Sequence, residues 1–228
     1  PVVLTGSQKS IYNRDTDARN NLWRAVAYAC HPDAWGVQIV FDNKVILGTR
    51  ARKTRTKSFN AFSSIDYPET AMFRDRRLIQ FLQRPAEYTH AVFSTALDPN
   101  VFVLRLVPGM RADIIPMLEG RYRALVLESF GVGGLPGGDD GAMFAAVRDW
   151  CGAGHLAVFT TQVPHEGSDL AVYEVGRAAK ALPGVLEAHD MTPEATAVKL
   201  MWVLGQTQDL PECRRLFYKT INHDLLFL

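Results

Sequence analysis

The segment Thr5–Gln8, which reads Thr-Gly-Ser-Gln, places a serine at a position where many proteins bind a ligand. The apolar run Val2–Leu4 before it predicts a short buried strand. Since α/β sheets present their ligand-binding turns at the carboxyl ends of strands, Ser7 is a candidate substrate-binding residue. A serine that only caps its own turn explains the same residues equally well. The residues alone leave both interpretations open.

A run of positive charge is the second feature with chemical potential. The Ser/Thr-rich stretch Gly48–Ser64 predicts a loop and carries five cations: Arg50, Arg52, Lys53, Arg55 and Lys57. On composition alone, such a run favours a solvated basic loop over a catalytic site. Nucleic-acid binding is disfavoured, because the run Arg50–Lys57 has no aromatic residue for base stacking and the formal net charge of the chain is only +1.

A glycine-rich segment, Phe130–Gly138, follows one predicted strand and precedes a predicted helix, as phosphate-binding loops do. It lacks the third glycine of the dinucleotide fingerprint and the Lys-Ser/Thr of a P-loop. The six histidines show no metal-ligand spacing such as His-x-x-x-His. We therefore expect neither a cofactor nor a metal ion.

The elements that position these features begin with a predicted helix from Asp17 to Ala29, which Asp17 is expected to cap. Gly36–Phe41 and Lys44–Leu47 predict two strands joined by a hairpin turn. The stretch Ile65–His90 is polar and irregular, which is typical of a linker. The apolar face of the helix is expected to contain Leu22, Trp23, Val26 and Ala27.

The rest of the chain alternates strands with helices. Predicted strands span 101–106, 124–128 and 155–161, and predicted helices span 111–119, 142–152, 192–204 and 211–218. The stretch 170–180 predicts a loop followed by a helix. The helix at 192–204 has an N-cap signal in Thr192 followed by Pro193. Alternation of this kind implies βαβ units and parallel sheets. We predict an α/β fold of two domains, the larger first domain at 1–95, incomplete at its amino end, and a smaller carboxy-terminal domain at 96–228.

Composition restricts the class of protein. A hydrophobic content of 47% and a charged content of 21% are typical of a globular protein, and the longest apolar runs are too short to span a membrane. The three cysteines are odd in number and widely spaced, which favours a reducing compartment and thus the cytoplasm. The chain begins at Pro1 inside an apolar run, so we expect a truncation or cleavage point there.

Five segments, in the same order as in the family, resemble the L-asparaginases, closest to the bacterial cytoplasmic (type I) branch. The resemblance extends from Pro1 to about Tyr218, with Ala18 in place of the family's usual glycine after the aspartate. The segments are Val2–Gln8, Asp17 with Asn21-Leu22, Gly36–Phe41 followed by Arg50–Thr54 and Phe59–Ser64, Gly131–Gly133, and Asp190–Ala195 with Lys199-Leu200.

The resemblance implies hydrolysis of L-asparagine to L-aspartate and ammonia through a threonine nucleophile, supported by a second group of threonine, aspartate and lysine. An amide carbonyl is a poor electrophile, so this reaction needs both an activated hydroxyl and oxyanion stabilisation. Lys53 matches the family's catalytic lysine. With this match, an active-site role for Lys53 is favoured over a solvated basic loop. We expect its ammonium to be buried beside a hydroxyl–carboxylate pair that comes from outside these 228 residues. Its pKa would have to be lowered, by burial or by a second cation, before it could act as a base. The backbone carbonyl of Ser7 would accept the N–H groups of the substrate amide.

The family's Thr-Gly-Gly-Thr and Gly-Thr-Asp-Thr motifs do not occur in this chain. We therefore expect the 228-residue stretch alone to be inactive and poorly folded in its first half, with the nucleophile supplied from elsewhere. Two alternatives remain open: a D-type glutamyl-tRNA(Gln) amidotransferase, and a non-catalytic amino-acid-sensing domain on the same scaffold.

The resemblance also implies partners. The expected substrate is a small molecule, L-asparagine, and the expected assembly is a homodimer or homotetramer. From charge and composition we expect neither nucleic acid nor a membrane as partner. In the family, the loop matching Gly131–Pro136 reaches a neighbouring active site and commonly carries an asparagine, where this chain has Gly134. Whether that contact exists here is left open.

Overall fold

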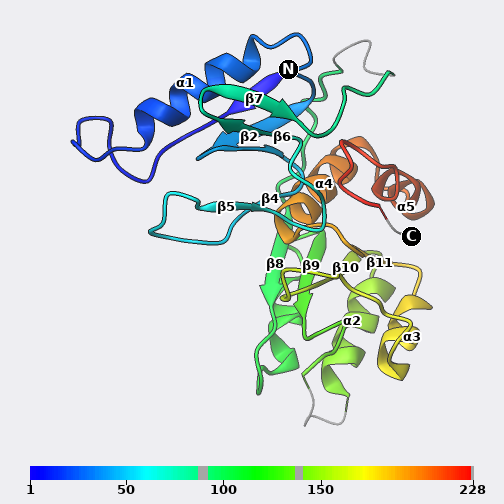
Figure 1. Cartoon of the computed structure of the whole chain (residues 1–228). Coiled ribbons are helices and arrows are strands. Elements are labelled where there is room, and N and C mark those ends of the chain that lie inside the picture. Colours follow the sequence, from blue (N-terminus) through cyan, green and yellow to red (C-terminus); the bar gives the residue numbers. More distant parts are fainter. Residues whose placement is uncertain (87–91, 137–140, 227–228) are drawn as a thin grey trace. The chain divides into compact units, whose positions relative to one another are not determined.

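The computed structural model describes residues 1–86, 92–136 and 141–226 (Figure 1). The chain divides into two compact units, Pro1–Ser94 and Thr95–Leu228. Each unit combines helices with sheets, so the predicted α/β class is confirmed. No helix in the described residues is both long and apolar enough to cross a bilayer.

The first unit contains a five-stranded sheet in the order β1-β2-β3-β6-β7, with helix α1 packed against β1 and β2 (Figure 1). Strands β1 and β2 pair in parallel around α1, which is the expected βαβ connection, and the other strands pair antiparallel, so the sheet is mixed. A separate pair, β4 and β5, forms a small antiparallel sheet within the predicted loop. The elements are β1 (Val2–Leu4), α1 (Ala18–Ala29), β2 (Val37–Phe41), β3 (Lys44–Leu47), β4 (Ala51–Lys53), β5 (Phe62–Ser64), β6 (Ala71–Arg74) and β7 (Arg77–Gln80).

The predicted hairpin of β2 and β3 is confirmed. Phe41 pairs with Lys44 across the turn, and Asp42 adopts a left-handed φ of 57°. Val40 and Val45 from the two strands pack with Tyr28 of α1 in the core of this unit. The hairpin thus fixes the face on which α1 lies.

The expected linker at 65–90 is wrong between Ala71 and Gln80, where β6 and β7 form a second hairpin. Its turn residues, Asp75 and Arg76, have left-handed φ values of 48° and 62°. Turns of this kind usually contain Asn-Gly or Asp-Gly, so the sequence lacks the glycine that would have indicated it. Residues 87–90 of the expected linker lie outside the described residues.

The expected burial of β1 and of one helix face is also wrong. Val2 and Leu4 are 51% and 52% exposed, and Leu22, Trp23 and Val26 are exposed as well. Helix α1 instead buries Asn21, Ala25 and Tyr28, which recur at helical spacing on its inner face. An asparagine occupies that face because its amide binds backbone groups, a role that apolar periodicity does not predict.

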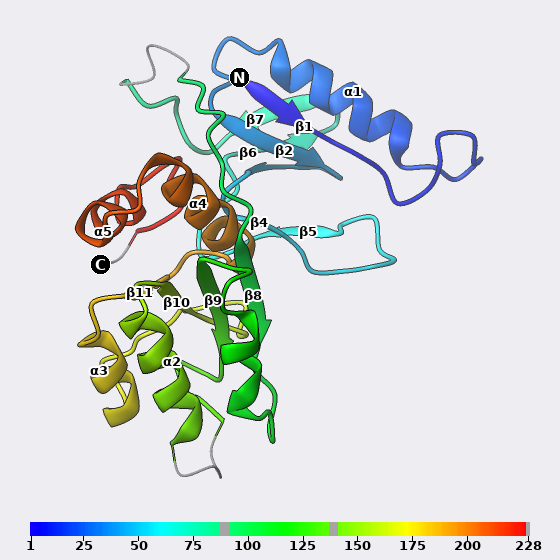
Figure 2. The ribbon, with the colours of Figure 1, turned by 180° about the vertical axis from the view of Figure 1, so that it is seen from behind.

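The second unit contains a four-stranded, fully parallel sheet in the order β11-β10-β9-β8, as predicted for this half of the chain (Figure 2). Its elements are β8 (Val101–Arg105), the 3₁₀ helices η1 (Ala112–Ile114) and η2 (Pro116–Leu118), β9 (Ala124–Ser129), α2 (Ala142–Gly152), β10 (Leu156–Thr161), α3 (Glu174–Lys180), β11 (Val185–Glu187), α4 (Pro193–Gln206) and α5 (Leu210–Phe217).

Side chains alternate between two cores across this sheet. Val126 and Val158 pack with α4 and α5 on one face, and Leu127 and Phe159 pack with α2 and α3 on the other. The short helix predicted at 111–119 is instead two 3₁₀ turns, and Pro116 begins the second because it lacks the N–H that a continuous helix would need. Strand β11 was not predicted.

Helix α4 begins as predicted. The Thr192 hydroxyl accepts a hydrogen bond from the Ala195 N–H at 3.1 Å, and Pro193 occupies the first helical position. One turn further, Lys199 forms a buried ion pair with Asp224, with 2.8 Å between Nζ and Oδ2. Burial lowers the pKa of Lys199, and the hydrogen bond to Asp224 opposes that shift. The pair ties α4 to the segment after α5.

Replacing one partner of this ion pair should be strongly destabilising. Lys199→Met leaves the Asp224 carboxylate buried without its cation, so we expect the free energy of unfolding to fall by about 3–5 kcal/mol in urea denaturation. Arg215→Met is the matched control, because it breaks only the exposed ion pair with Glu212 and should cost far less. Equal losses in the two variants would contradict a stabilising role for the buried pair.

His189 makes the stability of this unit depend on pH. Burial lowers the pKa of His189 below its ordinary value of about 6.5, although the Glu187 carboxylate opposes the shift. Below pH 6.5 the unfolded chain therefore binds a proton at His189 more readily than the folded chain does. The free energy of unfolding consequently declines as the pH falls from about 6.5 toward the lower pKa of the folded state. His189→Asn, whose asparagine tolerates the left-handed φ of 51°, should flatten this acid decline in thermal denaturation. His31→Asn is the control, and a similar flattening there would refute the assignment to His189.

Candidate active site

Lys53 and the turn that contains Ser7 meet in the first unit. The Lys53 Nζ donates a hydrogen bond to the Gln8 Oε1 at 3.1 Å. The Gln8 Nε2 in turn donates to the backbone oxygen of Ser58 at 3.0 Å. Gln8 therefore links the turn after β1 to the loop between β4 and β5, and the two residues singled out from the sequence lie close together.

Lys53 itself is exposed in the part of the chain that the structure describes. Its burial beside a hydroxyl–carboxylate pair from outside these residues stays a prediction. Lys53 ends strand β4, where it pairs with Phe62, and it begins a run of exposed residues that continues to Asn60. Among the described residues, no carboxylate forms an ion pair with its ammonium. The lysine is held at the turn by a neutral amide acceptor.

Ser7 is exposed, and neither its hydroxyl nor its backbone carbonyl forms a hydrogen bond with a described residue. This argues against the alternative in which Ser7 only caps its own turn. The backbone around it is held by its neighbours, since the Thr5 hydroxyl donates to the Val40 oxygen at 2.7 Å. The turn is thus fixed on both sides while the Ser7 carbonyl stays open to a donor from a ligand.

Asp17 fixes the far side of this turn and not the helix that follows it. Its carboxylate accepts hydrogen bonds from the backbone N–H groups of Gln8, at 2.9 and 3.0 Å, and Lys9, at 3.1 Å. It occupies the N-cap position of α1 but makes no capping hydrogen bond, so the expected capping role is wrong. The reason is its helical backbone conformation, whereas capping side chains usually sit on an extended residue.

Asn21 organises this turn, a role that the apolar pattern of the sequence does not predict. Its Nδ2 donates to the Gly6 oxygen at 2.9 Å and to Asp17 Oδ2 at 3.2 Å, and its Oδ1 accepts from the Asp42 N–H at 3.0 Å. It is buried, so these bonds satisfy an amide that would otherwise be costly to bury. The available signal was the spacing of Asp17 and Asn21, four residues apart and therefore on one helix face.

The glycine-rich loop after β9 uses its own backbone donors. The N–H groups of Gly133 and Gly134 both donate to the Phe130 oxygen, at 3.0 and 2.7 Å. A Cβ at Gly133 would come within 2.7 Å of Leu170, so that glycine serves close packing. These N–H groups are therefore not available to hold a phosphate. Gly137 and Gly138 lie outside the described residues.

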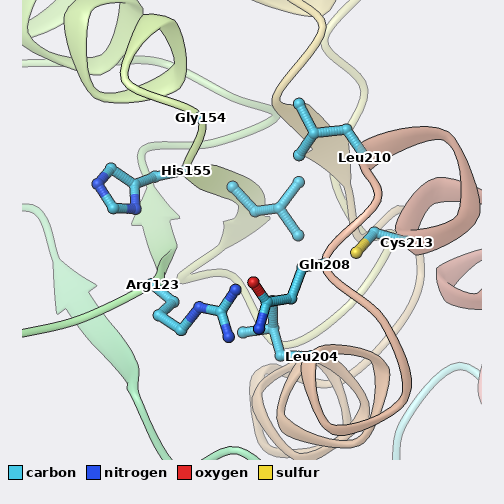
Figure 3. A pocket seen from close by; sticks show the side chains of 8 residues that line it. Arg123, Gly154, His155, Leu204, Gln208, Leu210 and Cys213 are labelled. Atoms are coloured by element: carbon cyan, nitrogen blue, oxygen red, sulfur yellow. The ribbon is translucent and has the colours of Figure 1, made fainter.

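A small cavity of about 130 Å³ in the second unit lacks a catalytic set (Figure 3). Of its polar side chains, Arg123 is already paired with Asp98 at 3.3 Å, and His155 stacks on Trp150. Burial raises the pKa of the Cys213 thiol, which makes it a poor nucleophile. Within the described residues, no group of three His, Cys, Asp or Glu side chains could hold a metal ion.

Comparison with protein families and known sequences places both halves of the chain. Residues 1–87 match the family model for the N-terminal domain of asparaginase, and residues 100–217 match that for the glutaminase/asparaginase C-terminal domain. The L-asparaginase of Thermococcus kodakarensis is 39% identical over 226 residues, which are 99% of this chain and 67% of that protein. The D-type glutamyl-tRNA(Gln) amidotransferase chain of Metallosphaera sedula is 31% identical over 95% of this chain and 51% of that protein.

Solved structures are similar over the whole chain. The L-asparaginase of T. kodakarensis matches with a TM-score of 0.92 and 36% identity, covering 100% of this chain and 68% of that one. L-asparaginase I of Vibrio cholerae matches with a TM-score of 0.84 at 24% identity, covering 100% of this chain and 68% of that one, which shows the fold alone. The chain thus spans about two thirds of these asparaginases and about half of the amidotransferase relative.

The hydrogen bonds of Asp17 predict that its carboxylate supports the turn. Asp17→Ala removes a charged acceptor from two backbone N–H groups, so we expect the free energy of unfolding to fall by about 1.5–3 kcal/mol. Amide hydrogen exchange at Gln8 and Lys9 should accelerate in this variant. Asp15→Ala is the control, because Asp15 is exposed and forms no hydrogen bond with a described residue. Unchanged exchange at Gln8 and Lys9 would contradict the role of Asp17.

Proposed function

The chain belongs to the glutaminase/asparaginase family, and on this premise we propose that the protein hydrolyses L-asparagine to L-aspartate and ammonia. The observation that carries the proposal is the 39% identity to an L-asparaginase over 99% of this chain. The hydrogen bond between Lys53 and Gln8 supports the proposal, because it brings Lys53 to the turn that contains Ser7. The family resemblance assigns Lys53 and Ser7 to one site.

The chemistry requires more groups than this chain contains. An amide carbonyl must be attacked by an activated hydroxyl while its developing oxyanion is stabilised. The resemblance assigns that hydroxyl to a threonine in a Thr-Gly-Gly-Thr motif, a sequence that does not occur among these 228 residues. The proposed contribution of this chain is therefore to position the substrate and to assist proton transfer.

Two residues carry these roles in the proposal. The Ser7 carbonyl accepts the N–H groups of the substrate amide, supported by its exposure and by the bonds that fix its neighbours. Lys53 assists proton transfer, supported by the hydrogen bond that holds its ammonium at Gln8. A carboxylate and a hydroxyl beside Lys53, together with exclusion of water, would complete the arrangement that lysine catalysis needs.

A D-type glutamyl-tRNA(Gln) amidotransferase is the alternative. Its representative from M. sedula is 31% identical, compared with 39% for the L-asparaginase, and this chain spans only 51% of it. These figures favour hydrolysis of free asparagine. An amino-acid-sensing domain without catalysis is the second alternative, and turnover of asparagine would exclude it.

The proposal includes a location in the cytoplasm and an assembly as a homodimer or homotetramer. Cys30, Cys151 and Cys213 are all free thiols in the structure, which is consistent with a reducing compartment. The oligomeric assembly is supported by the family resemblance and can be tested by size-exclusion chromatography with light scattering.

Lys53→Met tests the catalytic assignment in the native protein. Loss of a group that assists proton transfer should lower kcat/KM for L-asparagine by about 10²–10⁴-fold. Lys57→Met removes an exposed cation from the same loop and should leave kcat/KM within a few-fold of wild type. Ser7→Ala should be similarly mild, because it keeps the backbone carbonyl. Near-normal turnover by Lys53→Met would remove the catalytic assignment.

A further inference from the structure

The first unit contains a strongly basic groove, outside the candidate active site, between α1 and the turn of the β6–β7 hairpin. Its volume is about 620 Å³. Four arginines line it, Arg19 and Arg24 from α1 and Arg74 and Arg76 from the hairpin, and we refer to it as the arginine groove. Asp75 is its one acidic lining residue, so the groove carries an excess of three positive charges.

Two of the arginines are held in place by the fold. The Arg24 NH1 donates a hydrogen bond to the Asp42 backbone oxygen at 2.9 Å. The Arg76 guanidinium lies over the Trp23 ring, 5.7 Å from its centroid, and that ring packs edge-on against Phe73. Side chains that are already ordered lose less conformational entropy when a ligand binds. The groove is therefore partly preorganised.

The other two arginines are available to a ligand. Arg19 and Arg74 are exposed, and neither forms an ion pair or a hydrogen bond with a residue that the structure describes. Four guanidinium groups around one concave surface repel one another. A bound anion would relieve this repulsion.

Two arginines of the groove occupy positions where local sequence preferences favour other residue types. Arg19 lies in the first turn of α1, where the helix dipole favours acidic residues. Arg76 adopts a left-handed φ of 62° at a turn position that glycine would occupy without strain. Departures from local rules concentrate at functional or strained sites, so both positions are consistent with a functional groove.

We propose that the arginine groove binds a small polyanion with two or more phosphoryl groups, such as inorganic triphosphate or the triphosphate chain of a nucleotide. The planar guanidinium group donates two parallel hydrogen bonds to phosphate oxygens, which makes arginine the preferred residue for such ligands. The volume is in the range of small-molecule sites. The amides of Asn20 and Asn43, which also line the groove, add neutral donors. This site is separate from the proposed amidohydrolase activity and does not depend on it.

Isothermal titration calorimetry of the native protein tests the proposal, with inorganic triphosphate and ATP as separate probes at two salt concentrations. The double variant Arg19→Gln/Arg74→Gln should bind both probes at least about tenfold more weakly than wild type. Raising the salt concentration should weaken binding to wild type, since the contacts are exposed and electrostatic. Circular dichroism checks that the double variant remains folded.

The matched control is Arg14→Gln/Arg121→Gln, which removes the same charge from exposed arginines outside the groove and should bind like wild type. Equal affinities for triphosphate and ATP would support a site for the phosphoryl chain alone, and tighter binding of ATP would support a nucleotide site. The proposal is overturned if neither probe binds at millimolar concentration, or if the control weakens binding as much as the groove variant.

Discussion

The buried carboxylate of Asp17 is the group on which the geometry of the candidate active site depends. It accepts the backbone N–H groups of Gln8 and Lys9 and is itself held by Asn21. A charged acceptor forms shorter and stronger hydrogen bonds than a neutral one, and in a partly buried site those bonds are less weakened by water. One side chain at the start of α1 therefore fixes the position of the turn. Ser7 makes none of these bonds itself and is held in place by the residues on either side of it.

Helix α1 extends this constraint to the neighbouring hairpin. Asn21 accepts from the N–H of Asp42, and Arg24 donates to the carbonyl of the same residue. Both backbone groups of this left-handed turn residue are thus bound by side chains of one helix. Asn21 also bonds to the turn of the candidate active site, while Arg24 also lines the arginine groove. One rigid helix therefore supports two separate surfaces, and disturbing its packing should affect both.

The features that were predicted correctly are those that local sequence encodes. Thr192 and Pro193 mark the start of α4 because capping depends only on residues within one turn. The β6–β7 hairpin was missed because its turn contains Asp75-Arg76 without glycine, so the conformation is imposed by strand pairing. Asp17 was given the wrong role because a carboxylate before a helix fits a cap as well as a tertiary acceptor. Lys53 was located by resemblance to a family, and its exposure depends on packing that periodicity does not describe.

The candidate catalytic lysine also combines a feature that local sequence predicts with one that depends on tertiary structure. Residue types alone favoured a solvated basic loop at Lys53, and the structure does leave that lysine exposed while holding it at the Ser7 turn. The measurement that tests the account most directly is release of aspartate and ammonia from L-asparagine by the native protein, followed in a coupled assay. Saturable turnover proportional to protein concentration is the predicted result. Absence of turnover with free asparagine, together with ammonia release only when a glutamyl-tRNA acceptor is present, would contradict the account and identify an amidotransferase.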